Sequence, residues 1–166
     1  MSQRIQNYLS QHTAVIEALS AEIETIAAMI ELCTRRLAEG NKILICGNGG
    51  SAADAQHIAA ELIGRFVGDR RALPAIALTT DSSALTAIAN DYGYNAVFAR
   101  QVEGLGRTGD VLLSISTSGN SESVNEASRT AAALGMHTMA LTGKGGGALK
   151  SLADLALVVP SEVTAH

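Results

Sequence analysis

The sequence has no tryptophan, only two prolines and two cysteines, and aromatic residues make up 3% of its 166 residues. Cys33 and Cys46 do not provide the set of disulfides that holds a small secreted domain together, so we expect free, inert thiols in a reducing compartment. The chain also has no run of 18 apolar residues, and its first residues lack the apolar core of a signal peptide. We therefore expect a cytoplasmic protein without a membrane partner.

An excess of positive charge is also missing. The chain carries 12 Lys and Arg against 16 Asp and Glu, a net charge of −4. Binding to nucleic acid or to an acidic membrane surface requires a basic patch, so we expect neither partner. The apolar share of 47% and the length favour one α/β domain with a core of small aliphatic residues.

Residues 2–39 contain neither glycine nor proline, which favours one long helix or two. Ser20 is a candidate cap for a second helix, and Gly40 is typical of the residue that follows a helix end. Apolar residues recur at spacings of three and four from Ile5 to Leu37, and this row is typical of a helix that packs on a partner. His12 lies in the row, where we interpret it as a register feature rather than a ligand. We expect residues 1–40 to be a helical oligomerisation arm and residues 41–166 to form a separate domain.

After Gly40, short apolar segments alternate with helical ones. The pattern predicts strands at 42–46, 74–79, 110–115, 137–141 and 154–159, and helices at 51–66, 82–90, 95–105, 121–134 and up to 152. Helical crossovers between apolar strands indicate a parallel sheet covered on both faces, an α/β fold with three layers. If the strand order is 2-1-3-4-5, the order reverses between strands one and three, and ligands bind at such a point.

Two loops would meet at that point, residues 47–51 and residues 116–121. The first joins a strand to a helix through glycines, and free N–H groups at a helix start bind anions. The second offers four hydroxyl groups. Because neither loop contains Lys or Arg, we expect neutral donors to hold a phosphate; ordinary helix capping is the alternative, and it would account for one or two hydroxyls. The spacing Gly47-x-Gly49-x-x-Ala52 weakly matches the fingerprint of a dinucleotide site, but the acidic residue that the fingerprint requires after the second strand is absent, because Asp81 comes too late. The loop does not end in Gly-Lys-Ser/Thr, so it is not a P-loop.

His57 and Glu61 are four residues apart on the predicted helix 51–66 and therefore share one face. An imidazole and a carboxylate are both zinc ligands, although most such pairs are surface ion pairs. Their place on the helix behind the phosphate loop, two to three turns from its start, favours a functional role.

The stretches CGNGGSAADAQHIAAEL, LPAIALTTDSSALTAIANDYGYNAVF, GDVLLSISTSGNS and ALTGKGGG together resemble the phosphoheptose isomerases of the sugar isomerase (SIS) family. The resemblance implies a homotetramer with a five-stranded flavodoxin-like α/β/α sandwich. It implies isomerisation of sedoheptulose 7-phosphate to D-glycero-D-manno-heptose 7-phosphate, the first step towards ADP- and GDP-heptose and the lipopolysaccharide core. It also implies one zinc ion on His57 and Glu61, with Glu61 as the catalytic base. The substrate-binding residues that it implies are Asn48, Gly49, Gly50, Ser51, Glu61, Asp91, Ser116, Thr117, Ser118 and Ser121.

In the family, a Gln and a His from a further C-terminal helix complete the zinc site. The sequence ends at His166, which matches the position ahead of that Gln, so we expect no catalytic role for His166 and expect this helix to be missing from the sequence. The alternative function is that of related non-catalytic SIS proteins, which bind the bacterial replication initiator. Those proteins typically lack the glutamate and alter the loops, whereas Gly50, Asp54, Glu61, Ser118 and Gly119 follow the isomerase pattern and favour an enzyme.

Overall fold

Five short apolar segments form one parallel sheet in the order β2-β1-β3-β4-β5, in a computed structural model that describes residues 1–165. The predicted order 2-1-3-4-5 is confirmed. The strands are β1 (Ile43–Gly47), β2 (Ala75–Ala77), β3 (Val111–Ser116), β4 (His137–Thr142) and β5 (Leu155–Val158). β2 is an edge strand of three residues, half the length that the sequence predicts, and Pro74 precedes it with its carbonyl accepting a hydrogen bond from the N–H of Ile43.

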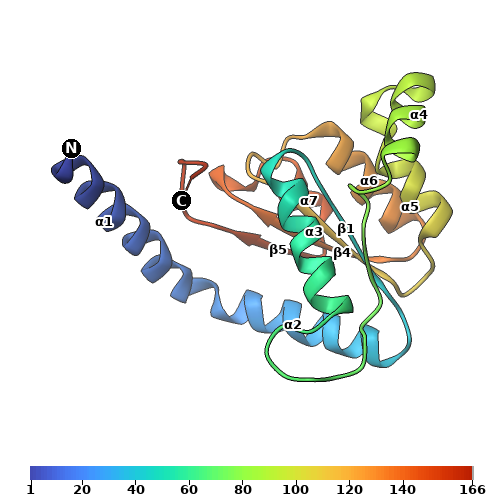
Figure 1. The fold of residues 1–166 in the computed structure, drawn as a ribbon, viewed down its shortest axis with the longest axis horizontal. Helices are drawn as coiled ribbons and strands as arrows, with labels where there is room; N and C mark the ends of the chain where they lie inside the picture. The colour runs from blue at the N-terminus through green and yellow to red at the C-terminus, as the bar shows by residue number, and fades with distance from the viewer. Residues whose placement is uncertain (166) are drawn as a thin grey trace.

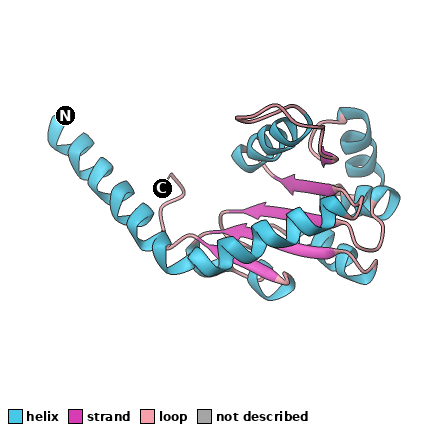
Figure 2. Ribbon diagram, turned by 90° about the horizontal axis from the view of Figure 1, so that it is seen from below, coloured by secondary structure: helices cyan, strands magenta, loops and turns pink. Residues whose placement is uncertain are grey.

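Helices cover both faces of this sheet, which confirms the three-layer α/β/α sandwich (Figures 1 and 2). Successive side chains of β1 point to opposite faces, so Ile43 and Ile45 enter one core while Leu44 and Cys46 enter the other. The helices α2 (Ile23–Ala38) and α3 (Gly50–Ile63) pack on the first face. The second face is covered by α4 (Ser82–Tyr92), the short 3-10 helix η2 (Tyr94–Ala96), α5 (Ala99–Leu105), α6 (Glu122–Ala133) and α7 (Leu149–Leu152).

The carboxyl ends of three central strands lie level with one another. Gly47 of β1 is in register with Ile115 of β3, and Ser116 of β3 is in register with Thr142 of β4. The loops that follow these strands therefore meet at one edge of the sheet, where α3 and α6 begin and where the 3-10 helix η3 (Lys144–Gly146) lies.

The N-terminal arm consists of two helices rather than one. α1 (Ser2–Ala18) and α2 are joined by the 3-10 helix η1 (Leu19–Glu22). Ser20 lies inside η1 and Glu22 takes the N-cap position of α2, so the predicted capping role of Ser20 is wrong. Gly40, with φ of 90°, follows the end of α2 as predicted. α2 packs on the sheet, whereas α1 buries no residue and projects from the body of the molecule (Figure 1).

α3 ends at Ile63, about one turn before the predicted end at Phe66. The guanidinium of Arg70 donates hydrogen bonds to the carbonyl oxygens of Glu61 and Leu62, at 2.7 and 2.9 Å. These contacts satisfy carbonyl groups that a helix end leaves unpaired, and Gly64 takes the C-cap position. No sequence pattern marks that tertiary contact.

Cys46 lies in the middle of the second core and is fully buried. Burial raises the pKa of its thiol to about 12, and the hydrogen bond with Ser114 opposes this shift only partly. Burial also raises the pKa of Cys33. Both thiols are therefore protonated and poor nucleophiles at neutral pH, as the sequence predicts. No helix among residues 1–165 is long and apolar enough to cross a bilayer.

Candidate active site

A polar cavity of about 210 Å³ lies between the loops that follow β1 and β3. Six of the residues that the sequence predicts for substrate binding line it, namely Asn48, Ser51, Ser116, Thr117, Ser118 and Ser121. Lys144 and Thr164 complete its polar wall. The reversal of strand order between β1 and β3 thus brings together two loops that are 65 or more residues apart in the sequence.

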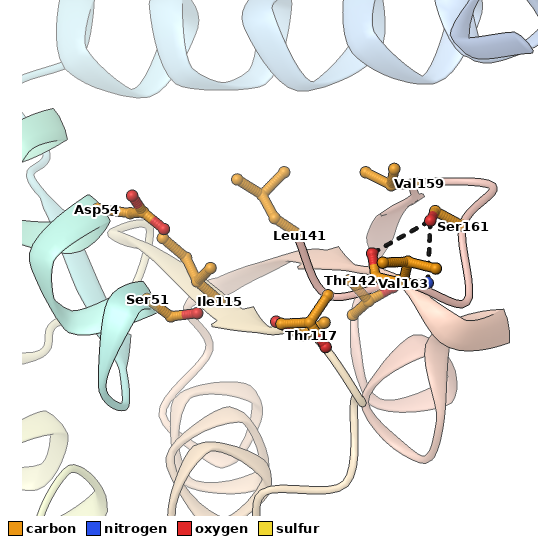
Figure 3. A pocket seen from close by; sticks show the side chains of 11 residues that line it. Ser51, Asp54, Ile115, Thr117, Leu141, Thr142, Val159, Ser161 and Val163 are labelled. Atoms are coloured by element: carbon orange, nitrogen blue, oxygen red, sulfur yellow. Dashed lines mark hydrogen bonds between the residues drawn. The ribbon is translucent and has the colours of Figure 1, made fainter. Parts of the chain in front are cut away.

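A second cavity of about 250 Å³ continues from the first, because Ser51, Ile115, Thr117 and Thr164 line both. Figure 3 shows its walls, with Ser51 and Asp54 of α3 on one side and Val159, Ser161 and Val163 of the chain after β5 on the other. We refer to the two cavities together as the cleft. One end is rich in hydroxyl groups, and the other is lined by Leu141 and Val159.

The hydroxyl groups of Ser116 and Ser121 face each other in the cleft at 3.2 Å. Ser121 occupies the N-cap position of α6, yet its side chain makes no capping hydrogen bond, and only its carbonyl oxygen accepts from the helix. Capping, the alternative explanation for these hydroxyls, is therefore wrong for Ser121. Its oxygen is available to a ligand at the start of α6, where the helix dipole favours an anion.

Asn48 joins the first loop to both neighbouring helical segments. Its Oδ1 accepts a hydrogen bond of 2.7 Å from the hydroxyl of Tyr94, and its Nδ2 donates one of 3.0 Å to Ser123 Oγ. The amide orientation is thereby fixed. Sequence reasoning identified Asn48 but not Tyr94, which belongs to the segment between α4 and α5 and reaches the loop only through the fold.

The remaining predicted residues lie outside the cleft lining. His57 and Glu61 are on α3, one helical turn apart, and Glu61 is roughly 15 Å along the helix axis from Ser51. Neither side chain makes a hydrogen bond or an ion pair within residues 1–165, so the surface ion pair that we considered does not form there.

Asp91 is exposed at the end of α4 and accepts a hydrogen bond from Asn90 at 2.8 Å. Gly49 and Gly50 form the exposed start of α3, where Gly49 has φ of 58°, a conformation that favours glycine.

Comparisons with known proteins agree with this geometry. The model of the SIS domain family matches residues 7–143. The chain is 49% identical over 164 residues to a phosphoheptose isomerase of Akkermansia muciniphila, covering 99% of this chain and 87% of the relative. It is 54% identical over 165 residues to one of Nitratiruptor, covering 99% and 88%. The solved phosphoheptose isomerase of Neisseria gonorrhoeae superposes with a TM-score of 0.93 at 46% identity, covering 99% of this chain and 88% of that one.

The chain belongs to the phosphoheptose isomerase family of SIS domains. The superposition covers 99% of the chain, so the five-stranded sheet and its helices have the fold of that solved isomerase.

In this SIS domain the predicted zinc ligands fit a metal in part. The imidazole of His57 and the carboxylate of Glu61 are donors that zinc accepts, both are unpaired in the described chain, and a spacing of four places them on one helix face. Among residues 1–165 no third His, Cys, Asp or Glu joins them in a group that could hold a metal ion. His166, to which we assigned no catalytic role, lies outside the described residues.

Sequence reasoning also missed Lys144. We expected neutral donors because the first two loops contain no Lys or Arg; these loops contribute only uncharged side chains to the cavity, but Lys144 lines it as well. Lys144 reaches the cavity from a third loop, the one that follows β4. The sequence could have indicated Lys144, because the loop Thr142-Gly-Lys-Gly-Gly-Gly147 follows a predicted strand and therefore lies at the same edge of the sheet.

Proposed function

We propose that the chain interconverts sedoheptulose 7-phosphate and D-glycero-D-manno-heptose 7-phosphate, an aldose–ketose isomerisation at the start of heptose-nucleotide biosynthesis. The observation that carries this proposal is the cleft at the reversal of strand order, where six predicted substrate residues line one cavity. The relatives of about 50% identity are phosphoheptose isomerases by name. That name, together with the intact Glu61, disfavours the alternative of a non-catalytic protein that binds the replication initiator.

The phosphate would sit at the hydroxyl-rich end of the cleft, at the start of α6. Neutral donors and a helix N-terminus bind phosphate in this way. This anchor is remote from the reacting carbons, and its binding energy fixes the position of the sugar for proton transfer.

The chemistry requires one base. We assign it to Glu61, which would take a proton from C1 of the ketose while the C1–H electrons form the enediol double bond and the C2 carbonyl oxygen gains a proton. Loss of the proton on O1 and return of one to C2 then give the aldose, so no oxidant or reductant is needed. Glu61 is partly exposed, on the helix that begins at the cleft.

We also propose that His57 and Glu61 contribute to a zinc site. A bound zinc ion would act as a Lewis acid towards the sugar oxygens. The apolar row on α1 further supports assembly into a homotetramer, because Ile5, Leu9 and Ile16 are each more than half exposed in the single chain.

The proposal is tested by Glu61→Gln, with Glu103→Gln as its control. Glu103 is an exposed residue of α5, on the other face of the sheet. We expect Glu61→Gln to reduce kcat by at least about 100-fold, the typical contribution of a general base, while calorimetry still detects binding of sedoheptulose 7-phosphate. Near-normal turnover by Glu61→Gln would remove Glu61 from the mechanism, and absence of any turnover by the unmodified protein would remove the proposed function.

A further inference from the structure

Lys144 has an unusual backbone conformation for a residue with a side chain. Its φ is 48°, and among residues 1–165 it is the only non-glycine residue with positive φ. This left-handed conformation is unfavourable for a residue other than glycine. Glycines flank Lys144 on both sides, yet this position carries a long charged side chain, and backbone strain of this kind is often found at functional sites.

The loop that carries Lys144 is fixed to the loop that follows β3. The N–H of Gly143 donates to the carbonyl oxygen of Thr117 at 3.0 Å, and the N–H of Leu149 donates to that of Gly119 at 2.9 Å. The N–H of Ala148 donates to Asn120 Oδ1 at 3.0 Å. A Cβ atom on Gly119 would overlap the carbonyl oxygen of Gly146, so the two backbones are in direct contact. Lys144 is thus held at a fixed place beside the hydroxyl groups.

The ammonium group of Lys144 has no charged partner in the described chain. It makes none of the ion pairs found among residues 1–165, and no other Lys or Arg lines either cavity of the cleft. The one carboxylate that lines the cleft, Asp54, belongs to the cavity beyond Ser51 and not to the one that contains Lys144. A lysine that lines the same cavity as the hydroxyl-bearing residues of the loop before α6 fits a site for a dianion.

We propose that Lys144 is a phosphate-binding residue of the cleft, and that the left-handed backbone at position 144, clamped by the contact between the loops after β3 and β4, directs its ammonium group to the phosphate of the substrate. This inference rests on the proposed function for the identity of the substrate, but the anion that it invokes can be tested without turnover.

The test compares three variants of the full chain. Lys144→Asn removes the charge while retaining a residue that tolerates positive φ, and Lys144→Arg retains the charge. Lys150→Asn is the matched control, because Lys150 is an exposed residue of α7 that lines neither cavity. Three quantities are measured: the Kd of inorganic phosphate by calorimetry, and the KM and kcat for sedoheptulose 7-phosphate.

For Lys144→Asn we expect KM and the Kd of inorganic phosphate to rise about tenfold or more, the usual effect of losing a charge-assisted hydrogen bond, with kcat changed less than threefold. Lys144→Arg should restore most of the affinity, and Lys150→Asn should match the unmodified protein. The difference between unmodified protein and Lys144→Asn should also shrink in 0.5 M salt, which a merely structural effect would not do.

Unchanged KM and phosphate affinity in Lys144→Asn would overturn the role of Lys144 while leaving the isomerase function intact. Conversely, the unmodified protein could bind phosphate more tightly than Lys144→Asn and yet show no turnover. That result would support the phosphate-binding role of Lys144 and overturn the proposed isomerase function. An unmodified protein that binds neither phosphate nor substrate would overturn both.

Discussion

Asn48 links three parts of the fold through one side chain. Its amide oxygen accepts from Tyr94, its amide nitrogen donates to Ser123, and its backbone belongs to the glycine turn after β1. The turn is therefore held at the cleft by specific hydrogen bonds and not by packing alone. Polar groups that fix one another in this way lower the entropy cost of binding a ligand.

Tyr94→Phe removes one of these bonds and nothing else. Tyr94 is 56% exposed, so the free energy of unfolding should change by less than about 1 kcal/mol. We expect KM to rise a few-fold because Asn48 is less well oriented. Tyr92→Phe is the control: its ring stacks on Arg100 at 4.3 Å, and its hydroxyl makes no hydrogen bond within residues 1–165. Equal kinetics for the two variants would remove Tyr94 from the site.

Ser116→Ala and Ser121→Ala test the hydroxyl end of the cleft. Each variant loses one neutral hydrogen-bond donor to the phosphate, which contributes about 0.5–1.5 kcal/mol, so KM should rise up to about tenfold while kcat changes little. Steady-state kinetics with the heptulose phosphate would measure both parameters. Unaltered KM values in the two variants would show that the phosphate binds elsewhere.

Asp110 lies directly before β3, at the amino ends of the strands and therefore at the side of the sheet opposite the cleft. It is 2% exposed, pairs with Lys42 and accepts hydrogen bonds from the N–H groups of Lys42 and Arg107. Burial tends to raise the pKa of Asp110, but these hydrogen bonds and the Lys42 charge outweigh it and hold the pKa below its usual value. The carboxylate therefore stabilises the fold above the pKa of the unfolded chain, near 3.9, and this contribution is lost as the pH falls through the lower folded pKa.

Asp110→Asn should consequently lower the free energy of unfolding by about 2–3 kcal/mol at pH 7, because Lys42 is left without its partner. The difference from the unmodified protein should diminish below about pH 4. Urea unfolding at several pH values measures this, with Asp69→Asn in an exposed loop as the control. A constant difference at all pH values would contradict the assigned role.

At the level of elements, the cleft depends on contact between the loops after β3 and β4. Comparing Gly119→Ala with Gly145→Ala distinguishes the effect of losing this contact from the effect of backbone strain alone. Both glycines have positive φ, 64° and 74°, but a Cβ on Gly145 meets no atom within 4 Å, whereas one on Gly119 meets Gly146.

We expect Gly119→Ala to raise KM by more than tenfold and to lower stability by at least about 2 kcal/mol, since the loops must separate. Gly145→Ala should cost about 1–2 kcal/mol from the left-handed backbone alone and alter KM far less. Thermal unfolding and kinetics on the pair give the comparison. Identical behaviour of the two variants would show that the loop contact does not shape the cleft.

The elements that sequence predicted well are those set by local patterns. Alternation of apolar strands with helices was sufficient for the parallel sheet, and parallel strands bring their following loops to one edge, so Asn48 and Ser116 were expected in one site. The contact of Tyr94 with Asn48 was not predictable in this way, because it joins segments that are 46 residues apart and no periodicity or spacing encodes it. The end of α3 and Lys144 did have local signals, namely Gly64 directly after the helix and the glycine-rich loop of residues 142–147.

At the scale of the whole molecule, α1 is a long helix that buries none of its residues in the single chain. We expect the full chain in solution to have a mass near four times 17.1 kDa, with the apolar row of the arm buried between subunits. Ile16→Glu places a charge in that row and should give a smaller species by light scattering coupled to gel filtration. Gln11→Glu adds the same charge off the row and should not. Assembly that tolerates Ile16→Glu would argue against the arm as the interface.

The measurement that tests the account most directly is conversion of sedoheptulose 7-phosphate in D₂O, followed by NMR with the full-length protein and with Glu61→Gln. The account predicts an aldose heptose 7-phosphate that carries solvent deuterium at C2, formed by the unmodified protein and at least about 100-fold more slowly by the variant. No aldose above the protein-free control would contradict the isomerase function. Aldose without deuterium, formed equally fast by Glu61→Gln, would contradict proton transfer by Glu61.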